Sequence, residues 1–222
     1  MVVDEHPIHR VRQEAGACVR CRDDGLTFRH EDGRWALPLF HKDATCPSRI
    51  VFVAEAPNLS DTFDPDKGRL TVDAETDPTG RFMRQLLESV GLTPEDVLVT
   101  NAALCLPAKK AGKFPVEAAI ARNCRPWLDR IIVAAEARVV VTWGRVALLG
   151  TRNVEPHKLE LRESVGKLHP WFGRLLLPLY HPGLLARKNR STAQQLEDIS
   201  CLKSVLPKRH DTPYLGSLVD PR

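Results

Sequence analysis

The chain has 222 residues, 43% of them hydrophobic and 27% charged, so it is long enough to bury one sizeable core. Its formal net charge of +4 is too small for bulk charge to indicate a nucleic-acid binder, because 28 acidic residues nearly balance 32 basic ones. The N-terminus lacks the apolar run of a secretory signal, and no stretch of about 18 apolar residues could span a bilayer. We therefore expect a cytoplasmic protein with no membrane partner.

Strand and helix patterns alternate along the chain. Four apolar runs, 49–57, 96–105, 137–144 and 173–182, have the character of strands buried on both faces. Residues 79–92 predict one helix, and a second helical stretch begins at Pro115 and is expected to restart at Pro126. This order predicts an α/β fold, a three-layer α/β/α sandwich around a central, mostly parallel four-stranded sheet.

The predicted core covers residues 49–209. Residues 1–48 are expected to pack on it within the same domain, with a peripheral strand pair between Cys21 and Ser48. Residues 210–222 have the composition of a flexible tail.

Four loops are expected at one edge of the sheet. In parallel sheets, functional residues gather at the carboxyl ends of the strands. This places 54–58, Asn101, 142–144 and His181 together, since each follows its own predicted strand. The convergence indicates a site.

The cysteines suggest a metal centre without specifying it. Cys18 and Cys21 form a C-x-x-C, Cys105 follows a predicted strand, and Cys124 lies near Pro126. Four thiolates suit an iron–sulfur cluster or a tetrahedral zinc ion, although Cys105 and Cys124 could equally be buried small residues. A zinc ribbon of Cys18, Cys21, His41 and Cys46 is a further alternative.

The ordered set of motifs resembles the iron–sulfur, family 4 branch of the uracil-DNA glycosylase superfamily. The matching pieces are C-V-R-C at 18–21, A-E-A-P-N at 54–58, T-N-A-A-L-C at 100–105, Cys124 and H-P-G at 181–183. Each is short, but together they span about Cys18 to Leu206 in the order of the family. The resemblance implies a DNA glycosylase that hydrolyses the N-glycosidic bond of uracil or a related deaminated base, with Cys18, Cys21, Cys105 and Cys124 holding a structural 4Fe-4S cluster and zinc less favoured.

The same resemblance assigns roles to the loops. Asn101 would pair with the edge of a flipped uracil, Glu55 would orient water or stabilise charge on the sugar, and His181 would stabilise the departing base. This makes Glu55, Asn101 and His181 the candidate catalytic residues. The candidate base-binding residues are Ala54, Glu55, Ala56, Pro57, Asn58, Pro78 and Asn101.

The loop after His181 is expected to contact DNA. Leu184 and Leu185 form an apolar tip that would fill the hole left in the base stack. Arg187, Lys188 and Arg190 would hold flanking phosphates. The expected partner is DNA containing a damaged or deaminated base, bound by a monomer.

Some positions depart from the family pattern. Ala54 and Asn58 replace the motif glycines, and Pro78 stands where the family has a phenylalanine that stacks on the base. Phe63, on an extended Asp-rich loop over 57–80, is a candidate replacement. These departures leave open which base is released, and also leave open a non-catalytic iron–sulfur protein that recognises damaged or single-stranded DNA.

Overall fold

The computed structural model describes residues 6–40, 48–59 and 77–206. Five strands form one sheet in the order β2-β1-β3-β5-β4. They are β1 (Ile50–Ala54), β2 (Leu98–Asn101), β3 (Val139–Trp143), β4 (His169–Trp171) and β5 (Arg174–Leu179). The first four positions in this order pair in parallel, as predicted, and β4 adds an antiparallel edge strand through a tight hairpin with β5.

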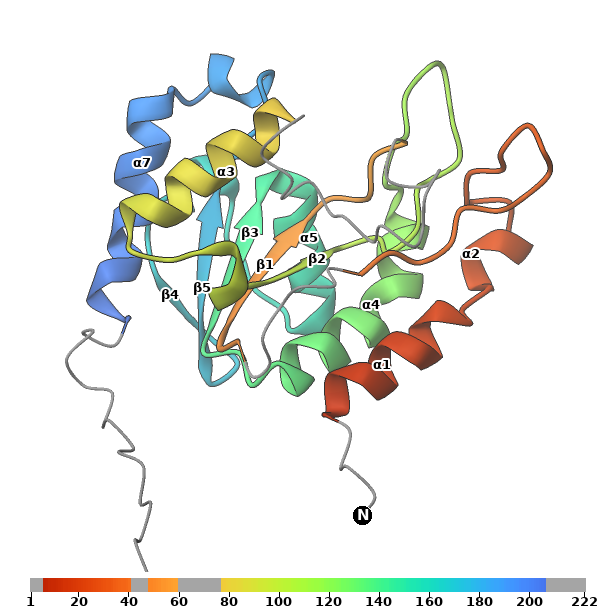
Figure 1. Cartoon of the computed structure of the whole chain (residues 1–222), viewed down its shortest axis with the longest axis horizontal. Helices are drawn as coiled ribbons and strands as arrows, with labels where there is room; N and C mark the ends of the chain where they lie inside the picture. Colours follow the sequence, from red (N-terminus) through yellow and green to blue (C-terminus); the bar gives the residue numbers. More distant parts are fainter. Residues whose placement is uncertain (1–5, 41–47, 60–76, 207–222) are drawn as a thin grey trace, which may run out of the picture.

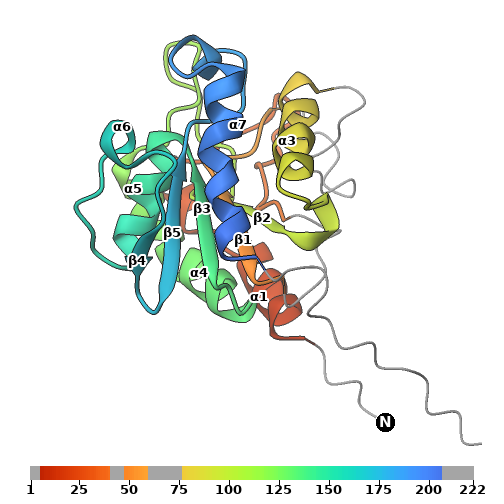
Figure 2. The same ribbon diagram turned by 90° about the vertical axis from the view of Figure 1, so that its left-hand side faces the viewer.

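Helices cover both faces of the sheet (Figures 1 and 2). On one face lie α1 (Pro7–Gly16), α4 (Ala118–Ala134) and α5 (Gly144–Val154), and on the other lie α3 (Pro78–Ser89) and α7 (Thr192–Ser200). The shorter elements are α2 (Arg20–Asp23), α6 (Leu161–Ser164) and the 3-10 helices Pro94–Asp96, Ala186–Lys188 and Cys201–Ser204. The predicted three-layer α/β/α class is therefore correct, with five strands in place of four.

The β-branched strands form the middle of the core because alternate side chains point to opposite faces. Val51 and Val53 pack towards α1, α4 and α5, whereas Ile50 and Phe52 pack towards α3 and α7. None of these four side chains is more than 6% exposed. A strand buried on both faces reads as a continuous apolar run, which is why the sequence located all four parallel strands.

The expected break at Pro126 was wrong, because α4 continues through this residue as a single helix starting at Ala118. Pro126 is exposed, whereas Ile120, Cys124, Leu128 and Ile131 on the same helix are buried. An internal proline costs a helix roughly 3 kcal/mol. Continuous burial of this apolar face on both sides of Pro126 offsets that cost.

The N-terminal segment packs along the core through backbone hydrogen bonds. The N–H of Phe28 donates to the carbonyl of Leu106 at 2.9 Å, and that of Leu39 donates to the carbonyl of Leu104 at 2.9 Å. Pairing around the turn at 31–33 is confined to one isolated bridge, between Arg29 and Trp35, rather than the strand pair expected there. No helix of the described ranges is long and apolar enough to cross a membrane.

Candidate base pocket and cysteine cavity

A small pocket of about 70 Å³ opens at the carboxyl edge of the sheet, on the face that packs against α3. Its floor contains the last residues of three neighbouring strands, Ala54, Asn101 and Trp143. A water-sized probe needs about 10–15 Å³ of such volume, so the pocket holds only a few waters and suits a single planar ring. The residues that line it are Ala54, Ala56, Asn58, Thr79, Met83, Val99, Asn101, Trp143, His181 and Pro182.

Asn101 presents a buried amide to this pocket. The residue is 1% exposed, and its Nδ2 has no hydrogen-bond partner among the described residues. A buried donor without a partner costs about 1–3 kcal/mol, so the pocket is incomplete without a ligand that offers an acceptor. Asn101, predicted from the sequence as a site residue, is one of the residues that line this pocket.

His181 is held in one protonation state by its own loop. The backbone N–H of Gly183 donates a 2.9 Å hydrogen bond to Nδ1, so Nδ1 is an acceptor and the proton of the neutral ring lies on Nε2. Burial lowers the pKa of His181, partly countered by Asp77. A Cβ at position 183 would lie 2.8 Å from Nδ1, so bare glycine backbone is needed for this approach.

Backbone pairing fixes loop 54–58 beside the pocket. The N–H of Ala102 donates to the carbonyl of Ala54 at 2.8 Å, and that of Ala103 donates to the carbonyl of Glu55 at 3.0 Å. Glu55 and Pro57 do not line the pocket, although Ala54, Ala56 and Asn58 do. Glu55 is half-buried, and desolvation raises the pKa of its carboxyl group.

The opposite wall comes from the start of α3 and not from Pro78 itself. Asp77 caps this helix by accepting a 2.8 Å hydrogen bond from the N–H of Thr79, and Pro78 is its exposed first residue. Because Pro78 turns outwards, Thr79 and, one turn later, Met83 face the pocket instead. Phe63, the candidate replacement for the stacking phenylalanine, lies outside the described residues.

The tip after His181 exposes two leucines, as its sequence indicates. Leu184 is 59% and Leu185 is 80% exposed. Such exposure is unusual for adjacent large apolar side chains, and it leaves both available to contact another molecule.

Two of the three basic residues beyond the tip form hydrogen bonds with other residues of the protein. Arg187 donates from Nε to the carbonyl of Pro182 at 3.1 Å and from Nη2 to that of Pro78 at 3.2 Å, while its guanidinium lies 4.2 Å from the centroid of the Phe82 ring. Arg190 forms a two-pronged pair with the buried carboxylate of Asp198, at 2.9 and 2.5 Å. Of the predicted phosphate contacts, Lys188 is the exposed one.

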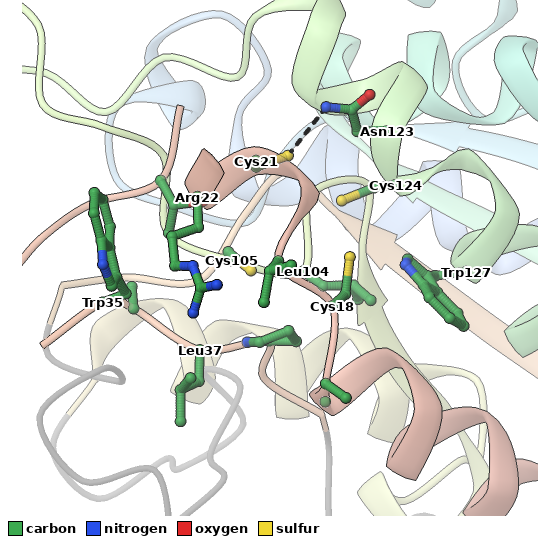
Figure 3. Close-up of a pocket in the computed structure, with 16 residues that line it drawn as sticks. Cys18, Cys21, Arg22, Trp35, Leu37, Leu104, Cys105, Asn123, Cys124 and Trp127 are labelled. Carbon is green, nitrogen blue, oxygen red and sulfur yellow. Dashed lines mark hydrogen bonds between the residues drawn. The ribbon is translucent and has the colours of Figure 1, made fainter. Parts of the chain in front are cut away.

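A second cavity, of about 260 Å³, is lined by all four predicted cysteines. Figure 3 shows Cys18, Cys21, Cys105 and Cys124 around this space, with Trp127 to one side of them. Cys21 belongs to a small apolar cluster with Ala103 and Ile120, and Ala56 packs against this cluster. Since Ala56 lines the base pocket, the cysteine cavity lies directly behind the two loops that build the pocket.

The thiols of this cavity have strongly perturbed acidities. Hydrogen bonds from Cys124 and Asn123 lower the pKa of Cys21 to about 6, and the Asn123 amide donates to its sulfur at 3.6 Å. Burial and the neighbouring thiolates raise the pKa of Cys105 to about 12. Cys21 thus ionises readily, whereas Cys105 resists ionisation. A bound cation would favour the thiolate form of both.

Within the described ranges, no three Cys, His, Asp or Glu side chains lie close enough together to hold a single metal ion. The four cysteines instead surround a space many times the size of one ion. His41 and Cys46, needed for the alternative zinc ribbon, lie outside the described residues. Cys201 does not line this cavity; it follows α7 and packs, partly buried, against the core.

Sequence reasoning missed Thr79, Met83 and Val99 of the base pocket; it placed Trp143 and Pro182 in site loops without giving either a role in base binding. One available signal was strand alternation. Asn101 and Val99 share a face, and the expected edge position of 142–144 placed Trp143 in the same row. The helical residues Thr79 and Met83 had no such signal, because their orientation depends on how α3 crosses the sheet.

Comparisons with known proteins agree with this architecture. The model of the uracil DNA glycosylase superfamily matches residues 41–200. A type-4 uracil-DNA glycosylase of Thermotoga maritima is 30% identical over 72% of this chain and 79% of its own length. That of Archaeoglobus fulgidus is 25% identical over 75% and 81%, and that of Sulfurisphaera tokodaii is 27% identical over 75% of each.

The family model covers well over half of the chain, and the Thermotoga relative reaches 30% identity over more than two thirds of it. The relatives and the ordered motifs agree on the same branch. The chain therefore belongs to the uracil-DNA glycosylase superfamily and, within it, to the type-4 branch.

Proposed function

We propose that this protein is a monofunctional DNA glycosylase that hydrolyses the N-glycosidic bond of uracil, or of a related deaminated base, and leaves an abasic site in DNA. The observation that carries the proposal is the buried Nδ2 of Asn101, which has no partner among the described residues, in a ring-sized pocket. An amide that offers both donor and acceptor atoms complements a carbonyl next to a ring N–H, the pattern that uracil has and cytosine lacks.

The two other catalytic candidates then act on opposite sides of the bond that breaks. With its proton on Nε2, His181 can donate a hydrogen bond to the oxygen of the base as negative charge grows there. Glu55 lies next to the pocket wall but outside it, which is where the sugar of a flipped nucleotide would stay. There its carboxylate can orient the attacking water or stabilise positive charge on the sugar.

Base flipping gives the exposed leucines a function. Leu184 and Leu185 can enter the vacated position in the duplex and offset part of the cost of unstacking. Lys188 can hold a flanking phosphate, with Arg187 and Arg190 chiefly supporting the loop. Replacing Leu185 by Ala should slow release from duplex DNA several-fold and leave release from single-stranded DNA unchanged, because only the duplex has a stack to fill.

The cysteine cavity fits a 4Fe-4S cluster held by Cys18, Cys21, Cys105 and Cys124. All four donors are thiols, which is the donor set such clusters use. The buried indole N–H of Trp127, which has no described partner, and the amide of Asn123 lie on the same cavity and can donate to sulfur. The cluster would serve as a structural crosslink between α2, α4 and loop 101–105, so no step of base release passes through it.

We propose that the protein acts as a monomer, which agrees with a base pocket and a cysteine cavity that are each lined by residues of a single chain. The catalytic relatives do not favour the non-catalytic DNA-binding alternative.

A base-release assay tests the proposal directly. Oligonucleotides with uracil opposite G, opposite A or in a single strand, together with hypoxanthine and xanthine, should be incubated and then cleaved by alkali at abasic sites. Uracil release is expected, and no release from any substrate by iron-loaded protein would overturn the proposal. Iron and sulfide analysis should find four of each per chain, whereas colourless protein with one zinc would reject the cluster.

A further inference from the structure

Trp143 occupies a place in the base pocket that mirrors that of Asn101. Ala54 pairs with Asn101 across β1 and β2, and the pairing of Val53 with Thr142 places Ala54 beside Trp143 across β1 and β3. Neighbouring strands are about 4.8 Å apart, so Asn101 and Trp143 flank the small side chain of Ala54 across roughly 10 Å. A ring seated above Ala54 would have Asn101 at one edge and Trp143 at the other.

The indole of Trp143 is fixed and has an unsatisfied donor. The residue is 4% exposed, and its ring packs against Phe52 with centroids 4.8 Å apart and planes inclined by 41°. Its Nε1 is buried and has no hydrogen-bond partner among the described residues. An indole N–H can only donate, and buried indoles usually find an acceptor.

Trp171 provides a comparison, because it is a buried tryptophan outside the base pocket whose indole N–H has an acceptor. It is also 4% exposed, but its Nε1 donates to the carbonyl of Glu155 at 3.0 Å, and it does not line the base pocket. Of these two equally buried tryptophans, the one without an acceptor is the one on the pocket floor.

We propose that the indole N–H of Trp143 donates a further hydrogen bond to the flipped base, in addition to Asn101 and His181, on the edge opposite Asn101. This inference rests on the proposed glycosylase function and narrows its substrate class. Two donors at opposite edges select a base with two separated carbonyl groups, and the small pocket selects one ring, so the preferred substrate is a 2,4-dioxopyrimidine. A base with a single carbonyl, such as hypoxanthine, leaves one donor unpaired and is released more slowly.

Replacing Trp143 by Phe removes the donor and keeps an aromatic ring on Phe52. The expected loss in kcat/KM for uracil is about 10- to 100-fold, the usual effect of leaving a buried polar group unpaired. Single-stranded substrates carrying 2-thiouracil or 4-thiouracil supply the critical comparison, because sulfur is a weaker acceptor than oxygen. The penalty should fall below about threefold for one thio base and persist for the other.

Trp171→Phe is the matched control, because it removes a partnered indole N–H away from the pocket. It should lower the melting temperature without changing the ratio of rates among the three bases. In ¹⁵N-labelled protein, free uracil should shift the indole signal of Trp143 and leave that of Trp171 in place.

The outcomes separate this inference from the function on which it rests. If the wild type releases no base, the glycosylase proposal fails. If the wild type releases uracil but Trp143→Phe loses nothing, or loses the same factor on all three bases, then Trp143 only packs and the inference is wrong. An indole signal that does not move with uracil would overturn it independently of turnover.

Discussion

The backbone N–H of Gly183 lies 2.9 Å from Nδ1 of His181, and this contact decides which ring nitrogen can act on a substrate. An N–H group can only donate, so the contact requires an unprotonated Nδ1. Protonating the ring would place two donors against each other. The sequence H-P-G thus contains both the histidine and the group that selects its neutral form, with the proton on Nε2.

The pH dependence follows from this contact. Burial lowers the pKa of His181 below its ordinary 6.5, so the neutral form is present throughout neutral and alkaline pH. We expect the single-turnover rate to show no loss from His181 above pH 7 and to fall on acidification below about 6.5. His181→Gln should cost about 10²- to 10³-fold at pH 7.5 and abolish this acid limb.

The lowered pKa of His181 should also make the folded protein less stable at acid pH. The unfolded chain takes up the proton at a higher pH than the folded protein, so the contribution of His181 to folding is present above 6.5 and lost as pH falls. Melting temperatures of wild type and His181→Gln should therefore converge towards acid pH. A rate that rises on acidification through 6.5 would mean that the imidazolium is the active form.

Removing the amide of Asn101 should separate activity from stability. Because Nδ2 has no partner within 6–40, 48–59 and 77–206, Asn101→Ala breaks no hydrogen bond at that atom in this part of the chain. We expect uracil release to fall at least 10²-fold with little change in melting temperature. Thr142→Val is the matched control, since it removes a buried hydroxyl that also has no described partner but lies on the opposite face of the sheet, and it should leave release unchanged. Equal losses in both variants would contradict a specific role for Asn101.

The sequence predicted the strands and their functional ends well, because these depend on local patterns. Apolar runs located β1, β2, β3 and β5, and parallel strands necessarily bring their carboxyl ends to one edge. It could not predict that Pro126 lies inside α4, because burial of the helix on both sides of it is a tertiary effect. Nor could it show that Arg187 and Arg190 have partners within the protein, since Pro78 and Asp198 approach them only in the folded chain.

Glu55 should lower the stability of the folded protein but be required for base release. Desolvation raises the pKa of its carboxyl group above the ordinary 4.5, so ionising it in the folded protein costs free energy at neutral pH. Glu55→Gln removes that charge, and we expect an equal or higher melting temperature together with a 10²- to 10⁴-fold lower rate. Thermal melts and single-turnover release on the same preparation would check the stability and the rate of Glu55→Gln. If this variant released uracil at the wild-type rate, Glu55 would have no catalytic role.

Arg187 and Lys188 are neighbours in the chain, but replacing them should have different effects. Lys188 is exposed, so Lys188→Ala should weaken DNA binding and reduce the slope of log affinity against log salt by about one, with the rate at saturating DNA unchanged. Arg187 joins the loop at Pro182 to the start of α3 at Pro78, and both segments border the base pocket.

Arg187→Ala should therefore lower the rate at saturating DNA by about tenfold or more and leave the salt slope near that of wild type. Arg187→Lys keeps the charge but cannot reach both carbonyls in a fixed fork, so it should not restore the rate. Measuring binding over a salt series and release at saturating enzyme would distinguish the two residues. If Arg187→Lys restored full activity, charge alone would be the requirement, and Arg187 would be a phosphate contact like Lys188.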